Sequence, residues 1–122
     1  MLAETVRFQF KRTEIVLLRP EQVRSVREGY TAELRHDFRR QALASLNRED
    51  RARFLRLSPL EVHHVLPVQY GGSNCVKNMV LLPRIDHQAA HDEIEMQTYG
   101  MDYGERRVIE LPFFQHFTWG LQ

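Results

Sequence analysis

Hydrophobic and polar side chains alternate at the start of the chain, where Val6, Phe8 and Phe10 are separated by polar residues. A period of two is typical of a half-buried strand. A second apolar run covers residues 15–18 and ends at an Arg-Pro pair, which makes it a candidate for the partner strand. The first twenty residues therefore predict a strand and a candidate partner beside it.

From Thr31 onward, the apolar residues recur with the period of a helix, and arginines lie between them. The apolar positions are Leu34, Phe38, Leu43 (or Ala42) and Leu46. Asn47 is suited to cap a further short helix over residues 48–55, because an asparagine side chain accepts a hydrogen bond from the first helical turn. Residues 1–56 are thus expected to form an Arg-rich extension of strand and helix.

The middle of the chain has the pattern strand, loop, strand, helix. Residues 62–66 and 79–82 are short strand candidates, and the loop between them contains Pro67, Gly71 and Gly72, which favour turns. Residues 84–98 are rich in helix formers, with Tyr99-Gly100 as a suitable end. Residues 107–119 are dense in aromatic side chains and are expected to belong to the core or to an edge strand.

Length and composition limit the classes of protein that the chain can belong to. A chain of 122 residues fits one domain. It has one cysteine, Cys75, so an intramolecular disulfide framework is excluded. No stretch approaches the roughly 20 apolar residues of a membrane span, and the first residues lack the apolar run of a secretory signal. We therefore expect a globular domain with no membrane segment.

Charge is distributed unevenly, although the net charge is only +1. Residues 1–62 carry 13 Lys or Arg against 9 Asp or Glu, whereas residues 63–122 carry 4 against 7. Fifteen of the 17 basic residues are arginine, whose planar guanidinium group suits phosphate. A solvated helical face with salt bridges explains the same pattern, so charge by itself is a weak indication of a nucleic-acid partner.

Four of the six histidines fall on the strand–loop–strand–helix unit. His87 and His91 are four residues apart on the expected helix, so they project from one face and can share a metal ion. The adjacent pair His63 and His64 lies on the expected strand, where neighbouring side chains point to opposite faces. One of the two can therefore face the helix as a third ligand, while the other faces a substrate.

These residues resemble a known family. The segment Glu61-Val-His63-His64-Val-Leu-Pro67, the Gly71-Gly72 pair, Asn78-Met-Val-Leu-Leu82, His87 and His91 are similar to the HNH, or ββα-metal (His-Me finger), endonuclease motif. The spacing is especially similar to that of the nuclease domains of DNase colicins and other bacterial polymorphic toxins. The resemblance covers about residues 57–98. It implies an α+β domain with a ββα-metal core, flanked by the extension at 1–56 and by the aromatic segment at 99–122.

The resemblance also implies a role for each motif residue. His63, His87 and His91 would bind one divalent metal ion, and His64 would be the general base that takes a proton from water. Asn78 would hold the loop and so orient His64, and Glu61 would pair with an arginine or steady a histidine. Zinc and nickel suit imidazole, whereas phosphodiester chemistry often uses magnesium, so the ion is left open.

The implied activity is metal-dependent, largely sequence-nonspecific cleavage of DNA, because no base-reading element is visible. Arg56, Lys77 and Arg84 are candidates for phosphate contacts on proximity alone. No small-molecule cofactor is expected. By resemblance, the chain is the toxin domain of a bacterial competition system: it stays in the cytoplasm of the producer, bound by a cognate immunity protein, and acts in the cytoplasm of a rival cell.

Two alternatives stay open. The first is a stand-alone phage or restriction-type nuclease of the same chemistry. The second is a non-catalytic zinc module that binds DNA, in which Cys75 joins the three histidines and closes a tetrahedral site. The second alternative offers no use for His64.

Overall fold

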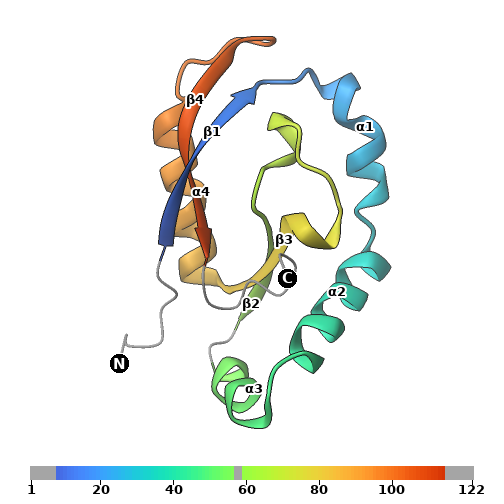
Figure 1. Ribbon diagram of the computed structural model, residues 1–122. Helices are drawn as coiled ribbons and strands as arrows, with labels where there is room; N and C mark the ends of the chain where they lie inside the picture. Colours follow the sequence, from blue (N-terminus) through green and yellow to red (C-terminus); the bar gives the residue numbers. More distant parts are fainter. Residues whose placement is uncertain (1–7, 57–58, 115–122) are drawn as a thin grey trace.

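The computed structural model describes residues 8–56 and 59–114, which form a mixed α+β fold (Figure 1). An N-terminal strand and three helices come first. A strand, a loop with two short 3-10 turns, a second strand and a long helix follow, and a fourth strand ends the described chain. The elements are β1 (Phe8–Val16), α1 (Pro20–Gly29), α2 (Ala32–Ala44), α3 (Arg48–Leu55), β2 (Leu60–His64), η1 (Val68–Tyr70), η2 (Val76–Asn78), β3 (Met79–Pro83), α4 (Arg84–Thr98) and β4 (Arg106–Phe114).

The strands form two antiparallel pairs, β1 with β4 and β2 with β3. The expected pairing of the first strand with residues 15–18 is wrong, because Ile15 and Val16 continue β1 itself. Residues 11–14 include no turn former, so the chain stays extended through them. The partner comes from the other end of the chain, with Phe8 opposite Phe114 and Val16 opposite Arg106. Val6 and residues 115–119 lie outside the described residues.

The helices begin and end where local capping groups allow it. The Thr31 hydroxyl accepts a hydrogen bond from the Leu34 amide at the start of α2. Asn47 caps α3 through a 2.8 Å bond from the Asp50 amide to its side-chain oxygen, as the sequence predicts. The prediction of a helix over residues 84–98 is confirmed by α4.

The β2–β3 pair has a hydrophobic core on each face. On one face, Leu60 and Val62 of β2 pack with Met79 and Leu81 of β3 against Phe38 and Ala42 of α2. On the other face, Val80 and Leu82 pack against α4 and the β1–β4 pair. In Figure 1 this arrangement places β2 and β3 between α4 on one side and α2 on the other. The alternation along each strand therefore sends neighbouring residues into different environments.

The loop between β2 and β3 is held by a side chain. Asn78 accepts a 2.9 Å hydrogen bond from the Leu66 amide and donates 2.9 Å bonds to the carbonyl oxygens of Leu66 and Ser73. Because the Leu66 amide is used in this way, β2 ends at His64, two residues before the end of the strand expected over residues 62–66. Gly72 lies against the same carbonyl, so close that a Cβ there would sit 1.7 Å from the Leu66 oxygen.

Replacing Gly72 by alanine is expected to lower the free energy of unfolding by at least about 2 kcal/mol. The added Cβ would clash with the Leu66 carbonyl, which Asn78 holds in place by a hydrogen bond. Gly71→Ala is the matched control: its Cβ meets open space, and only its φ of 100° opposes a side chain, at about 1–2 kcal/mol. Urea unfolding of both variants checks the prediction. A smaller loss for Gly72→Ala than for Gly71→Ala would contradict it.

Among the described residues, every helix is too short or too polar to cross a bilayer.

Candidate metal centre

The buried histidine of the site lies on β2. His63 is 1% exposed and shares a face of the strand with Glu61, and this face is directed toward α4. Its ring centre lies 5.1 Å from that of His87 and 5.5 Å from that of His91, and both contacts are edge-to-face. The strand alternation expected for the His63-His64 pair therefore places His63 beside the helix.

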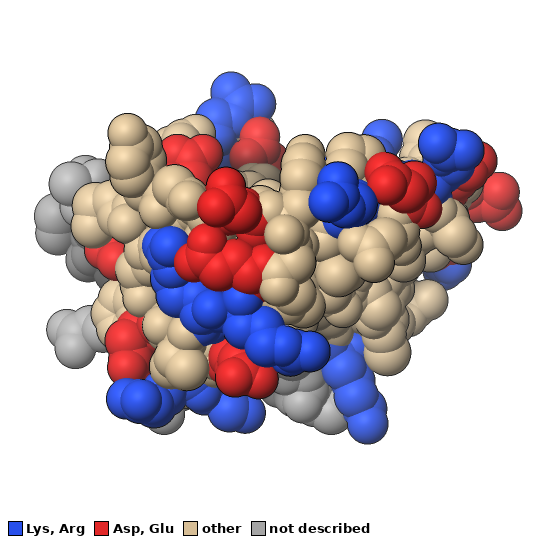
Figure 2. Space-filling model, turned by 90° about the horizontal axis from the view of Figure 1, so that it is seen from above, with Lys and Arg blue, Asp and Glu red and all other residues tan. Residues whose placement is uncertain are grey.

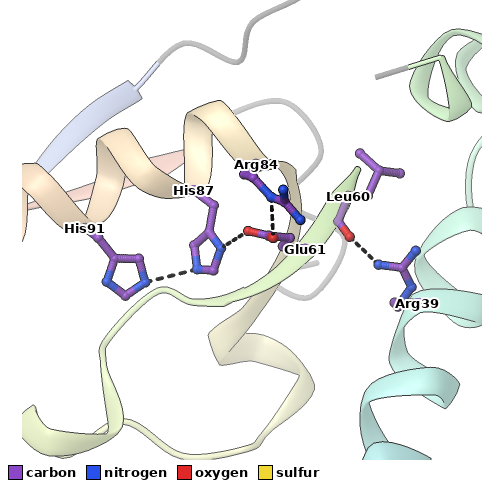
Figure 3. A network of polar contacts seen from close by, with 6 residues as sticks. All are labelled: Arg39, Leu60, Glu61, Arg84, His87 and His91. Atoms are coloured by element: carbon purple, nitrogen blue, oxygen red, sulfur yellow. Dashed lines mark hydrogen bonds and ion pairs between the residues drawn. The ribbon is translucent and has the colours of Figure 1, made fainter. Parts of the chain in front are cut away.

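The other two histidines project from one face of α4. His87 and His91 are one helical turn apart, and their Nε2 atoms lie 3.0 Å from each other (Figure 3). Together with a ring nitrogen of His63, they offer ligand atoms that all lie within 4.8 Å of one another. Nitrogen ligands about 2.0–2.1 Å from a tetrahedral ion are roughly 3.3 Å apart, so the two Nε2 atoms already have a suitable spacing. These three histidines are close enough to hold one metal ion.

A carboxylate orients one of the three imidazoles. Glu61 lies on β2 and approaches His87 Nδ1 to 2.8 Å with one oxygen, while its other oxygen accepts a 2.9 Å hydrogen bond from Arg84 Nε. Figure 3 shows this chain from Arg84 through Glu61 and His87 to His91. The bond to Nδ1 makes that atom the protonated one in a neutral ring, which leaves the Nε2 lone pair for a metal. The same two bonds lower the pKa of the Glu61 carboxyl group.

Replacing Glu61 by alanine is expected to weaken zinc binding about 10- to 100-fold, because His87 would lose the group that fixes its tautomer and its orientation. Zinc affinity is measured by competition with a chelating dye. Glu14→Ala is the matched control. Glu14 lies on β1 and forms an ion pair at 3.6 Å with Arg106 of β4, so it takes no part in the histidine cluster. Equal affinity of the Glu61 variant and the control would contradict the role assigned to Glu61.

Burial favours the neutral form of two ligands. The pKa of His63 is held well below the usual histidine value, chiefly because the ring is buried and also because His87 and His91 lie near it. Burial also lowers the pKa of His91, with a further contribution from His87. A neutral imidazole is the form that binds a metal, and three nitrogen donors suit a borderline divalent ion. The donor set therefore fits the metal site that the sequence predicts.

The metal-free protein is expected to lose stability as the pH falls from about 7 to about 5.5. In this range the unfolded chain binds protons on His63 and His91, whose pKa values are lowered in the folded state, so acid favours the unfolded chain. Urea unfolding in the presence of a chelator measures the effect. The change of the unfolding free energy with pH should be smaller in His91→Gln, which keeps only His63 of the two histidines. An unfolding free energy that does not change with pH would contradict the prediction.

His64 points away from the three ligands. Its Nε2 lies 2.9 Å from Asn74 Oδ1, and its ring meets the Tyr30 ring edge-on at 4.8 Å between centres. A pocket of about 350 Å³ is nonetheless lined both by His64 of β2 and by two of the candidate ligands, His87 and His91 of α4. Its lining includes Arg27, Tyr30, Val62, His64, His87 and His91. The pocket thus brings a histidine outside the cluster next to the candidate metal position.

The three basic residues singled out in the sequence are dispersed. Arg84 is paired with Glu61, while Arg56 and Lys77 are exposed at the end of α3 and in η2, and neither is among the pocket-lining residues. Basic and acidic side chains lie next to one another on the face seen in Figure 2. Cys75 is exposed and does not belong to the group of ligand atoms. The structure therefore does not place a fourth, thiolate ligand beside the three histidines.

Sequence reasoning missed two residues that line the pocket, Arg27 and Tyr30, and one that contacts His64, Asn74. Arg27 and Tyr30 come from α1 and the residue after it, and Asn74 comes from the glycine loop. Nothing in their local sequence pattern indicates a contact with His63, His64, His87 or His91. The first of these histidines lies more than 30 residues from Tyr30 along the chain. The only local signal was Asn74 in the loop with Gly71 and Gly72, and an asparagine in such a loop indicates a turn rather than a contact with His64.

No protein-family model, curated protein or solved structure matches this chain.

Proposed function

We propose that the chain is a metal-dependent endonuclease of the HNH type, in which β2, β3 and α4 form the ββα-metal unit. The observation that carries the proposal is the combination of two features. Three imidazoles converge within 4.8 Å, and His64 lines the same pocket without belonging to that group. A purely structural metal site would need the first feature only. A hydrolytic site needs both, because a base must stand beside the metal and remain outside its ligand set.

In the proposed hydrolysis of a phosphodiester, His64, Glu61 and Arg27 each have a separate role. A bound divalent ion supplies stabilisation of negative charge on the phosphate and on the departing oxygen. His64 takes the proton of the attacking water. Glu61 keeps His87 in the tautomer that presents Nε2 to the ion. Arg27, exposed on the last turn of α1 and lining the pocket, binds a phosphate oxygen of the substrate.

We propose DNA as the substrate, cut with little regard to sequence. The pocket lining includes three histidines, an arginine and a tyrosine, which suit phosphate and sugar rather than a base edge in a groove. The setting we propose is a bacterial toxin domain, which is blocked in the producer by an immunity protein and acts in the cytoplasm of a rival cell. This setting predicts that expression without the partner gene kills the host.

Nicking of supercoiled plasmid tests the proposal. Metal-stripped protein is supplied with magnesium, zinc or nickel, and its bound metal is measured in parallel. His36→Ala is the matched control, because His36 is exposed on α2 and outside the histidine cluster. The proposal predicts cleavage with at least one metal by the wild type and by the control. If the protein binds zinc stoichiometrically and cleaves neither DNA nor RNA, the chain is a non-catalytic metal module and the proposal fails. If it cleaves RNA alone, the choice of substrate is wrong.

A further inference from the structure

A chain of polar contacts connects His64 to helix α1. The Asn74 side chain lies between them: its Oδ1 is 2.9 Å from His64 Nε2, and its Nδ2 donates a 2.7 Å hydrogen bond to the carbonyl oxygen of Val26. Val26 and Asn74 are 48 residues apart in the sequence. The glycine loop thereby joins β2 to a helix outside the strand–loop–strand–helix unit.

The direction of each bond in this chain is set by the one before it. The Val26 carbonyl oxygen can only accept, so the Asn74 atom that faces it must be the NH₂ group. The amide oxygen of Asn74 then faces His64, and this oxygen can only accept as well. Nε2 of His64 must therefore carry the ring proton. In the neutral ring, the lone pair is left on Nδ1.

The Asn74 amide is also confined by its surroundings. A Cβ on Gly29 would lie 3.3 Å from Asn74 Nδ2, so the backbone at the end of α1 passes close to the amide. Tyr30 follows this glycine and packs its ring edge-on against His64 at 4.8 Å. The end of α1 thus holds both the imidazole and the side chain that orients it.

We propose that Asn74 is a positioning residue, which holds His64 in one ring orientation and in the tautomer with Nδ1 free to accept a proton. This inference rests on the proposed function, because it assigns the basic nitrogen of the proposed general base. It also gives α1 a role in the site. The carbonyl of Val26 fixes the amide, and the amide fixes the imidazole.

The test combines a spectroscopic readout on the zinc-loaded chain with kinetics in whichever of magnesium, zinc or nickel supports plasmid cleavage. Long-range proton–nitrogen NMR spectra of the histidine rings report which nitrogen of His64 carries the proton, and His64→Gln identifies its signals. Asn74→Ala removes both bonds. Asn74→Asp keeps an acceptor for Nε2–H but loses the donor to Val26. Ser73→Ala is the matched control in the same loop, and thermal melting shows whether each variant is folded.

We expect the Nε2–H tautomer in the wild type, in Ser73→Ala and in Asn74→Asp, and a mixture of tautomers in Asn74→Ala. Asn74→Ala should also lower kcat for plasmid cleavage about 10- to 100-fold, with KM changed less than about threefold, because the base is misoriented while the substrate contacts remain. A wild-type ring protonated on Nδ1, or an Asn74→Ala variant with unchanged tautomer and kcat, overturns the inference.

The failure of the proposed function is a separate outcome. A wild type that cleaves no nucleic acid refutes the nuclease, and the NMR result then still decides whether Asn74 sets the His64 tautomer. A wild type that cleaves, with an Asn74→Ala variant that cleaves equally well and is folded, supports the nuclease and refutes the positioning role.

Discussion

Replacing His64 by alanine is expected to lower the rate of plasmid cleavage by about 10²- to 10⁴-fold, the range usual for loss of a general base. Metal binding should be unaffected, because His64 does not belong to the group of ligand atoms formed by the three other histidines. Its ring nitrogen Nε2 faces Asn74 instead. The measurement is the initial rate of nicking at saturating metal, with the metal content of each protein recorded from the same preparation.

Two controls make this result specific. His36→Ala removes an exposed histidine from α2 and should cleave like the wild type. Thermal melting of His64→Ala shows whether the loss of the ring contact with Tyr30 weakens the fold. A folded His64→Ala variant that retains zinc and cleaves at the wild-type rate would remove the general base from the proposed mechanism.

Loss of a ligand histidine is expected to have the second large effect. His63→Ala should weaken zinc binding by more than about 100-fold, since removing a ligand exceeds the effect of removing its hydrogen-bond partner. Zinc at 100 times its dissociation constant stabilises a folded protein by about 2.7 kcal/mol, and this stabilisation should disappear in the variant. Thermal melting with and without zinc measures the loss.

The burial of His63 complicates this variant, because alanine leaves a cavity between β2 and α4 and destabilises the metal-free protein too. His91→Ala is the companion variant, since His91 is more exposed than His63 and its loss leaves no buried cavity. The His91→Ala variant should lose the zinc-dependent rise in melting temperature. Without metal, its melting temperature should be close to that of the metal-free wild type. A zinc-dependent rise of wild-type size in both variants would show that the three histidines do not hold the ion.

The unit from β2 to α4 could be predicted largely from the sequence, because its signals are local. The i, i+4 spacing of His87 and His91 places them on one face once residues 84–98 form a helix, and helix formers fill that segment. In the same way, strand alternation separates His63 from His64 without any knowledge of the rest of the fold. These rules act over a few residues, so they hold before any long-range contact is known.

The sequence alone thus determined the helix, the two short strands and the histidines that converge, since backbone periodicity directs these side chains. Only the tertiary structure decided what surrounds them. It paired β1 with β4 from the far end of the chain, and it brought Val26, Asn74 and His64 into one hydrogen-bonded chain. Contacts of this kind depend on how whole elements pack, and a polar residue in a loop carries no local sign of a partner 48 residues away.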